Sequence, residues 1–380
     1  MRFIFFQNCI SPHQMPYIEA LSRRSEVGGI RVIAPRLTYN DRAAMGWSKE
    51  VSRDMPNLRI AIRPADGDVM RWLQEDIAAD RANGENPVCL FSGINAFPEV
   101  FHWLRMTLGL DVRRGDITEA PYLFEHPLWM HRLRFLLKDL KYVRYFSWVF
   151  AIGEDCKTYY EGWSRRWKVV PFMYCTKRLS SALRADVENY LSTAEPDPSV
   201  CRIAFVGSVD ERKNVITVLE ALKLIATGHP DAFARCQVTL VGDGPLREEL
   251  EQKSRDEGLA GNIHFAGTRA MDETQRILAA QDILILPSLH DGWGAVVNEA
   301  LTLGVWPVVS DRCGARQVIT EGRNGNVFPV SDATALSKLL LNAIGNTGQI
   351  RASRRERMGW AETHISPDAV ADIMLQTVKS

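Results

Sequence analysis

The chain has 380 residues, of which 46% are apolar and 24% charged, and its formal net charge is zero. This composition excludes a disordered chain and is typical of a globular protein with two domains. Residues 1–180 carry 26 Lys and Arg against 20 Asp and Glu, and residues 181–380 carry the reverse. The basic first half favours a negatively charged partner, but it contains no recognised nucleic-acid-reading motif, so no nucleic acid is expected.

The seven cysteines are scattered and form no CxxC pair, which argues against a zinc site or disulfide framework and favours a reducing compartment. The run MRFIFF is too short for the apolar region of a signal peptide. No run reaches the ~20 apolar residues that a membrane-spanning helix needs. We therefore expect a cytoplasmic protein, either in solution or at the inner face of the cell membrane.

Short apolar runs alternate with helical patterns along the chain. Strands that are apolar throughout and alternate with helices indicate parallel sheets covered on both faces, which is an α/β architecture. The run LSTAEPDPSV at 191–200 predicts a domain boundary, because Pro, Ser and acidic residues precede a new strand. We expect doubly wound domains at 1–190 and 191–365, with ligands in the cleft at the carboxyl ends of the strands. The predicted strands are 2–6, 30–34, 87–91, 148–152, 202–207, 237–242, 282–287 and 306–310.

Residues 131–148, HRLRFLLKDLKYVRYFSW, have apolar side chains at helical spacing and carry five basic residues against one acidic residue. Two interpretations stay open. Such a helix can lie on an anionic membrane surface and present an acceptor site to a lipid-linked sugar. Alternatively, its apolar face packs in the core and its basic face is solvated.

Loops at strand ends in the second half carry residues suited to phosphate. In FVGSVDERKNV, Gly207 ends a strand and Lys213 precedes an amphipathic helix, where a mobile cation and free amides suit a phosphate. Alternatively, Lys213 is a solvated loop lysine. VGDGPLREEL has a glycine turn at Gly242 but is not the dinucleotide fingerprint GxGxxG. Arg269 follows the strand-end Gly267 and is expected to point into the cleft.

The stretch PSLHDGWGAVVNEAL, 287–301, holds two carboxylates and two glycines after an apolar run. Asp291 lies in the loop and Glu299 about one turn into a helix that begins near Val296, so both can face one crevice. Carboxylates accept hydrogen bonds from sugar or ribose hydroxyls, and glycines and the helix start offer amides to a diphosphate. Alternatively, Asp291 caps the helix and Glu299 is a surface residue.

Together these segments resemble glycosyltransferase family 4, a retaining family with the GT-B fold of two Rossmann-like domains facing a central cleft. The resemblance covers nearly all of residues 202–335, and IHFAGTR and GRNGNVFPVSD contribute to it. It implies transfer of a sugar from a UDP- or GDP-linked donor to a saccharide or lipid-linked acceptor in polysaccharide biosynthesis. It also implies that no metal ion or other cofactor takes part.

The resemblance implies that Asp291 contacts the donor sugar, Glu299 the ribose and Lys213 the diphosphate, with the amides of 292–295 holding sugar and phosphate. Asp291 stands where the family hallmark has a glutamate. Ser208 stands where the family usually has an arginine, so a second cation at the diphosphate is missing unless Arg212 supplies it. The predicted donor-binding residues are Gly207, Ser208, Arg212, Lys213, Gly242, Arg269, Asp291, Gly292, Trp293, Gly294, Ala295, Val296 and Glu299.

In the first half, residues 8–21 resemble the first loop and helix of polysaccharide-building members. Glu119 stands where many members have a histidine facing the acceptor. The resemblance implies an acceptor site with His13 and a catalytic Glu119 that binds or deprotonates a hydroxyl; for His13, a loop histidine without this role is the alternative. Residues 168–176 resemble the exit to the second domain, and a final helix at about 366–380 is expected to pack back on the first domain.

Other functions are compatible with these residues. A nucleotide-sugar epimerase or a phosphorylase can use a similar fold, but an epimerase turns over the donor without an acceptor, and a phosphorylase needs a lysine that holds pyridoxal phosphate. A catalytically inactive nucleotide-sugar-binding subunit is a further alternative, supported by the departures at Asp291 and Ser208. It predicts donor binding without sugar transfer.

Overall fold

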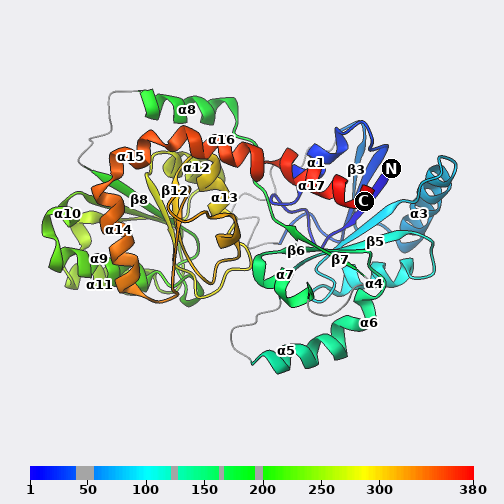
Figure 1. The fold of residues 1–380 in the computed structure, drawn as a ribbon, viewed down its shortest axis with the longest axis horizontal. Coiled ribbons are helices and arrows are strands. Elements are labelled where there is room, and N and C mark those ends of the chain that lie inside the picture. The colour runs from blue at the N-terminus through cyan, green and yellow to red at the C-terminus, as the bar shows by residue number, and fades with distance from the viewer. Residues whose placement is uncertain (40–54, 121–126, 162–166, 193–199) are drawn as a thin grey trace. The chain divides into compact units, whose positions relative to one another are not determined.

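The computed structural model describes residues 1–39, 55–120, 127–161, 167–192 and 200–380. The chain divides into two compact units, the first made of residues 1–177 and 367–380 and the second of residues 178–366. Each unit is built around one parallel sheet with helices packed on it (Figure 1). The predicted α/β class, with two Rossmann-like units, is therefore confirmed.

The first unit has a seven-stranded sheet in the order β3-β2-β1-β4-β5-β6-β7. Chain order reverses between the neighbouring strands β1 and β4, so the loops after these two strands diverge at the carboxyl edge of the sheet. The strands are β1 (Arg2–Phe6), β2 (Gly29–Ala34), β3 (Leu58–Ile62), β4 (Val88–Ser92), β5 (Arg113–Glu119), β6 (Trp148–Ile152) and β7 (Lys168–Phe172). The helices are α1 (Met15–Ser22), α3 (Asp66–Arg81), α4 (Pro98–Thr107), α5 (Leu128–Arg134), α6 (Leu140–Val143), α7 (Glu154–Glu161) and α17 (Pro367–Lys379).

The second unit has a six-stranded sheet in the order β10-β9-β8-β11-β12-β13, and its chain order reverses between β8 and β11. The strands are β8 (Cys201–Val206), β9 (Cys236–Val241), β10 (Ile263–Gly267), β11 (Ile283–Leu286), β12 (Trp306–Ser310) and β13 (Asn326–Phe328). The helices are α8 (Ser181–Ser192), α9 (Ile216–Gly228), α10 (Pro230–Ala234), α11 (Arg247–Asp256), α12 (Met271–Ala279), α13 (Val296–Thr302), α14 (Ala333–Gly345), α15 (Thr347–Ala352) and α16 (Arg354–His364).

The eight predicted strands are all present, within about two residues at each end. Five further strands of the structure, β3, β5, β7, β10 and β13, were not among the eight predicted. The register of β3 with β2 pairs Arg59 with Arg31, and its burial alternates only in part, as suits an edge strand rather than an apolar run. Strand β13 has three residues, too few to show a periodic pattern.

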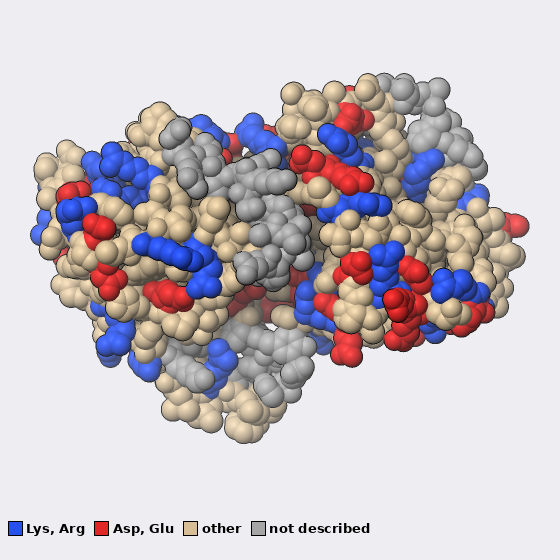
Figure 2. Space-filling model, turned by 180° about the vertical axis from the view of Figure 1, so that it is seen from behind, with Lys and Arg blue, Asp and Glu red and all other residues tan. Residues whose placement is uncertain are grey.

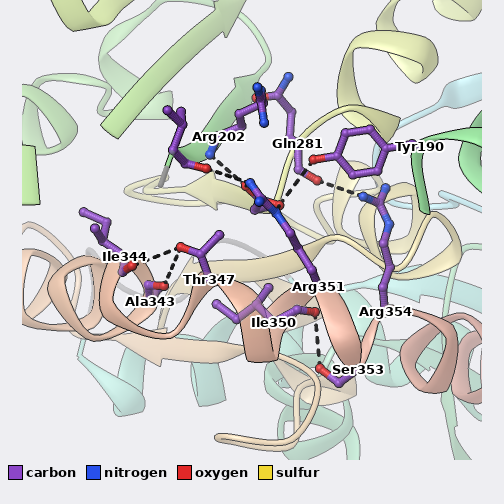
Figure 3. A network of polar contacts seen from close by, with 12 residues as sticks. Tyr190, Arg202, Gln281, Ala343, Ile344, Thr347, Ile350, Arg351, Ser353 and Arg354 are labelled. Atoms are coloured by element: carbon purple, nitrogen blue, oxygen red, sulfur yellow. Dashed lines mark hydrogen bonds and ion pairs between the residues drawn. The ribbon is translucent and has the colours of Figure 1, made fainter. Parts of the chain in front are cut away.

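The observed division at 177/178 lies earlier than the predicted boundary at 190/191, because α8 packs with the second unit. Figure 3 shows Tyr190 of α8 in a network of polar contacts with Arg351 and Arg354 of the second unit. Arg351 contacts both carboxylate oxygens of Asp282 at 2.8 Å, and the Tyr190 hydroxyl of α8 lies 3.4 Å from the same carboxylate. The Arg354 guanidinium stacks on the Tyr190 ring, 4.9 Å from its centroid. Of the predicted boundary run 191–200, residues 193–199 lie outside the described residues.

The final helix α17 belongs to the first unit, where it packs beside α1 (Figure 1). Arg24 pairs with Asp368 at 3.2 Å and Asp372 at 2.8 Å, and the Arg113 guanidinium donates to the carbonyl of Val378 at 2.9 Å. These contacts fix both ends of α17 on the sheet and on α1.

The predicted helix at 131–148 begins and ends earlier than expected. It consists of α5, a π turn η1 (Phe135–Asp139) and α6, and the chain then enters β6 at Trp148. Of the apolar positions predicted at helical spacing, Val143 is buried, whereas Leu133, Leu136, Leu137 and Leu140 are exposed. Packing of the whole apolar face in the core, one of the two interpretations, is therefore wrong.

Candidate functional site

The candidate site in the second unit lies where chain order reverses between β8 and β11. Parallel doubly wound sheets bind ligands at the carboxyl ends of their strands, at this kind of reversal. The loop after β8 carries Lys213, and the loop after β11 carries Asp291. The two loops are joined by the backbone amide of Leu289, which donates to the carbonyl of Arg212 at 2.8 Å.

The β8 loop is shaped by Asp210. Its carboxylate accepts from the backbone amide of Lys213 at 2.9 Å and from the Ser208 hydroxyl at 2.7 Å. This cap forms a short 3₁₀ turn, η2 (Glu211–Lys213), and Asn214 follows in the left-handed conformation with φ 53°. Ser208 therefore stabilises the loop and adds no positive charge to it.

Lys213 and Asp291 meet in a close ion pair. The Lys213 Nζ lies 2.5 Å from Asp291 Oδ2, and the side chains are 12% and 14% exposed. The Arg212 guanidinium lies 3.8 Å from the same oxygen and is 49% exposed. Two cations thus flank one carboxylate, so Lys213 is not the lone cation of this loop.

Glycines allow the loops after β8 and β9 to cross at van der Waals distance. A Cβ at Gly242 would lie 1.8 Å from the carbonyl oxygen of Gly207, and one at Gly244 would lie 2.3 Å from that of Val209. Gly242 has φ +134°, a conformation that L residues rarely adopt. Gly242 therefore has a backbone role that only glycine can fill.

The loop 291–295 is held by the segment that follows β12. The amide of Gly314 donates to the carbonyl of Asp291 at 2.9 Å, and that of Ala315 to the carbonyl of Trp293 at 2.7 Å. Gly294 has φ +89°, and a Cβ there would lie 2.7 Å from Cys313 Sγ. Within the described part of the chain, the amides of 292–295 donate to no protein acceptor. Such amides before a helix start are suited to an anion.

Trp293 takes part in the loop through its backbone. Its side chain is 2% exposed, and its indole nitrogen donates to the Asn298 side chain at 2.7 Å. The ring therefore packs inside the second unit and supports α13 from below the loop. The backbone of Trp293, and not its ring, is available to a ligand.

Glu299 lies in the first turn of α13, as predicted, and Val296 is the first residue of that helix. Burial raises the pKa of the Glu299 carboxyl from 4.5 to about 7. No described side chain pairs with this carboxylate. A half-buried carboxylate of this kind is suited to accept hydrogen bonds from the hydroxyl groups of a ligand.

Arg269 and Arg247 each pair with a carboxylate close in sequence. Arg269 lies before α12 and pairs with Glu273 at 3.4 Å, a contact along the helix surface. Arg247, which the sequence analysis did not single out, pairs with Asp243 at 3.1 Å and Glu251 at 2.8 Å. It lies beside the strand-end Gly267, where a Cβ would come within 3.1 Å of its guanidinium. Its position after a glycine turn was the only signal for it in the sequence.

The first unit has a different cluster at the reversal between β1 and β4. The Gln7 amide donates to the Gln14 side-chain oxygen at 2.6 Å, and the Ser92 hydroxyl lies 3.3 Å from the same oxygen. All three side chains are buried. These contacts fix the Gln14 side chain between the loops after β1 and β4.

Tyr174 links this cluster to the two residues predicted for an acceptor. Its hydroxyl is hydrogen-bonded to Glu119 and Gln14, and burial followed by the Glu119 charge raises its pKa well above 10. Glu119 is the exposed last residue of β5. His13 lies in the loop after β1, with its ring centroid 6.4 Å from that of Tyr174. Glu119 and His13 thus both lie near Tyr174, a residue that was not among the predicted site residues.

Neither a metal cluster nor a spanning helix is found among the described residues. There, no three His, Cys, Asp or Glu side chains are grouped to hold a metal ion. Over the same residues, no helix is long and apolar enough to cross a membrane.

Residues 196–361 match the sequence profile of glycosyl transferases group 1. A lipopolysaccharide core biosynthesis glycosyltransferase, LpsE, of Rhizobium meliloti (strain 1021) is 30% identical over 223 residues, which are 58% of this chain and 59% of that protein. A phosphatidyl-myo-inositol mannosyltransferase of Mycolicibacterium smegmatis is 30% identical over 152 residues, 40% of this chain and 37% of that protein. The chain thus spans less than two thirds of the length of these relatives.

The fold is similar to that of solved glycosyltransferase-like structures. Anabaena Alr3699/HepE in complex with UDP matches with a TM-score of 0.66 and 15% identity, over 100% of both chains. At this identity the likeness shows the fold alone. The two Rossmann-like units are those of a GT-B fold, as the sequence analysis predicted.

Proposed function

We propose that the protein is a retaining glycosyltransferase that moves a sugar from a nucleoside diphosphate sugar to a saccharide or lipid-linked acceptor in surface-glycan biosynthesis. The observation that carries this proposal is the Lys213–Asp291 pair beside the free amides of 292–295, at the chain reversal of the second sheet. This site lies within the segment that matches glycosyl transferases group 1. The names of the relatives support a glycan or lipid acceptor, and UDP in the Anabaena structure supports a nucleotide-sugar donor.

In this proposal the second unit holds the donor. The amides of 292–295 and the cations of Arg212 and Lys213 bind the diphosphate, and Asp291 accepts hydrogen bonds from sugar hydroxyls. Glu299 accepts from the ribose. When the bond between the anomeric carbon and the phosphate oxygen breaks, negative charge grows on the diphosphate. Preorganised amides and cations stabilise that charge without reorganising.

Donor binding requires Lys213 to exchange partners. The Lys213 ammonium is paired with Asp291 at 2.5 Å. A diphosphate carries more charge than one carboxylate and competes for the ammonium, while Arg212 stays close enough to compensate Asp291. Arg212 is thus the second cation of this loop, which has Ser208 where the family usually has an arginine.

In this proposal the first unit presents the acceptor. Glu119, with Tyr174 fixed behind it and His13 near by, binds the acceptor hydroxyl. We propose a front-face route for retention, in which no carboxylate acts as a nucleophile. The acceptor oxygen bonds to the anomeric carbon on the face that the phosphate leaves, and the acceptor's proton passes to the leaving phosphate oxygen. The products are a glycoside and a nucleoside diphosphate.

The test is a transfer assay on the full chain with radiolabelled UDP- and GDP-sugars, each with a saccharide acceptor, a polyprenyl diphosphate sugar, or no acceptor. We expect one donor to give a labelled product whose anomeric configuration, assigned by NMR, matches that of the donor. Lys213→Ala should abolish transfer, whereas Lys223→Ala, an exposed lysine of α9, should not.

The alternatives give different outcomes in the same assay. An epimerase converts the donor sugar in the tube without acceptor. An inactive binding subunit shows nucleotide binding in a thermal-shift measurement but no labelled product with any acceptor. Thermal stabilisation by no nucleotide at all would count against every form of this proposal.

A further inference from the structure

The segment α5–η1–α6 exposes a stripe of large apolar side chains. Among the described residues, six of the nine large apolar side chains that are strongly exposed belong to this one segment. Their spacing, with steps of three and four residues, places them along one helix face. They are Trp129 (62% exposed), Met130 (37%), Leu133 (48%), Leu136 (52%), Leu137 (65%) and Leu140 (37%).

The opposite face anchors the segment to the core. Phe135 is fully buried, and its ring lies 5.7 Å from that of Tyr159 and 6.2 Å from that of Trp167, measured between centroids. Val143 is 1% exposed. The exposed stripe is therefore not the face by which the segment packs on the core, because Phe135 and Val143 form a separate buried face.

The π turn keeps the buried residues on one face of the segment and the exposed residues on the other. Phe135 and Val143 are eight residues apart, and in a regular α-helix that spacing would rotate one away from the other by roughly 80°. A π turn accommodates about one extra residue, so the eight positions act nearly as seven, which is about two turns. Both anchors then face the core while the leucines between them face solvent.

Positive charge borders the apolar stripe. Arg132, Arg134, Lys141 and Arg144 are exposed, and none of them pairs with a described carboxylate. Arg144 instead donates to the Tyr145 hydroxyl at 2.8 Å, and Lys141 lies over the Tyr142 ring. Figure 2 shows blue side chains among tan ones in the lobe at the bottom of the view.

We propose that α5, η1 and α6 form a surface that binds an anionic lipid bilayer. A helix with an apolar face and flanking Lys and Arg lies in the membrane interface, with its apolar side chains among the acyl chains and its cations at lipid phosphates. The segment Leu128–Val143 is too short to span a bilayer, so it lies in the plane of the surface. The Trp129 indole, with its apolar body and polar nitrogen, suits that interface.

A second copy of the chain fits this surface less well. In a symmetric dimer the same four cations would face each other across the contact, and residues 127–147 contain one acidic residue, Asp139, to offset them. An anionic lipid surface supplies the opposite charge. This inference goes beyond sugar transfer, because no residue of the segment belongs to the donor or acceptor clusters.

The experiment is co-sedimentation of the full chain with vesicles of phosphatidylcholine alone or with one third phosphatidylglycerol. We expect binding to the anionic vesicles that weakens with added salt, and at least tenfold weaker binding for Leu136→Glu/Leu137→Glu. The matched control is Leu224→Glu, which alters a leucine 45% exposed on α9, and it should bind like the wild type. Arg132→Glu/Lys141→Glu should lose binding to anionic vesicles, although it leaves the exposed apolar side chains of the stripe unchanged.

Three results would overturn the proposal. The first is wild-type protein that stays in the supernatant with both kinds of vesicle, and the second is a double variant that sediments like the wild type. The third is self-association without lipid in analytical ultracentrifugation that Leu136→Glu/Leu137→Glu removes, since a second copy would then cover the stripe. Thermal stabilisation by nucleotides should be equal in all variants, which separates failure of this surface from failure of the donor site.

Discussion

The two chain reversals of this protein carry different kinds of site. At the reversal of the second sheet the groups are mainly backbone: loops crossing at Gly207 and Gly242, free amides at 292–295, and one ion pair, Lys213–Asp291. At the reversal of the first sheet they are side chains from separate elements, with Gln14 held by Gln7 and Ser92 and linked to Glu119 through Tyr174.

This difference fits the two substrates that we propose. A diphosphate is the same in every nucleotide sugar, and backbone amides with one or two cations bind it whatever sugar is attached. Acceptors vary in the hydroxyls that they present, and side chains on separate strands can change independently of one another. The comparison predicts that substitutions in the second unit affect every donor, and substitutions in the first unit affect some acceptors more than others.

Of the four substitutions that test this comparison, Asp291→Ala has the largest expected effect. Removing this carboxylate removes the proposed contact to the donor sugar and also frees Lys213, so kcat/KM for transfer should fall about 100-fold while UDP or GDP binds at least as tightly as before. Steady-state kinetics and calorimetric titration of the nucleotide measure the two effects. If nucleotide affinity fell as far as activity, Asp291 would act by shaping the loop rather than by contacting the sugar.

Gly242→Ala tests whether the reversal of the second sheet depends on close contact between two backbone loops. The new Cβ would lie 1.8 Å from the Gly207 carbonyl, in a backbone with φ +134°, so the loops must separate. We expect a loss of about 3 kcal/mol in the free energy of unfolding and a melting temperature roughly 6–12 °C lower. Gly261→Ala is the control, because its Cβ meets nothing within 4 Å. Equal melting temperatures for the two variants would contradict the loop geometry.

Tyr174→Phe tests whether the proposed acceptor site at the reversal of the first sheet depends on contacts between side chains. It keeps the ring and removes the hydroxyl that joins Gln14 to Glu119. We expect kcat/KM for the acceptor to fall about tenfold and KM for the donor to stay unchanged, since only the acceptor side loses positioning. Tyr145→Phe, an exchange outside the cluster, is the control. A raised donor KM would mean that the two reversals are not separate sites.

Glu299→Gln gives the smallest expected effect, a pH-dependent change in stability. The folded pKa of about 7 lies above the ordinary 4.5, so as pH rises the unfolded chain releases its proton first. The stabilisation from the protonated carboxyl is complete below about pH 4.5 and is lost as pH rises through 7. The variant should melt with the wild type at pH 4.5 and a few degrees above it at pH 8. An unchanged difference across that range would show that Glu299 is ionised throughout.

Much of the fold and of the donor side could be predicted because the relevant signals are contiguous in sequence. Apolar runs that alternate with helices identify parallel sheets, and Asp291 and Glu299 lie within one loop and the helix after it. Lys213 stands a fixed distance after β8, at the end of η2. In such segments local patterns and tertiary positions coincide.

The remainder depends on contacts between distant residues. Tyr174 meets Gln14 and Glu119 only after β1, β5 and β7 have joined one sheet, and no local pattern marks that meeting. The pairing of Arg269 along α12 depends on Glu273 and on where the helix begins. Exposure of the leucines in α5–η1–α6 depends on a π turn, which shifts the helical register in a way that a regular periodicity cannot predict.

The central claim is that the strand-end loops of the second unit bind a nucleoside diphosphate. Calorimetric titration of UDP and of GDP into the full chain and into Lys213→Ala tests it most directly. We expect the wild type to bind at least one of the two nucleotides and the affinity to fall on the order of 100-fold in the variant. Binding of neither nucleotide to the wild type, or equal binding to both proteins, would contradict it.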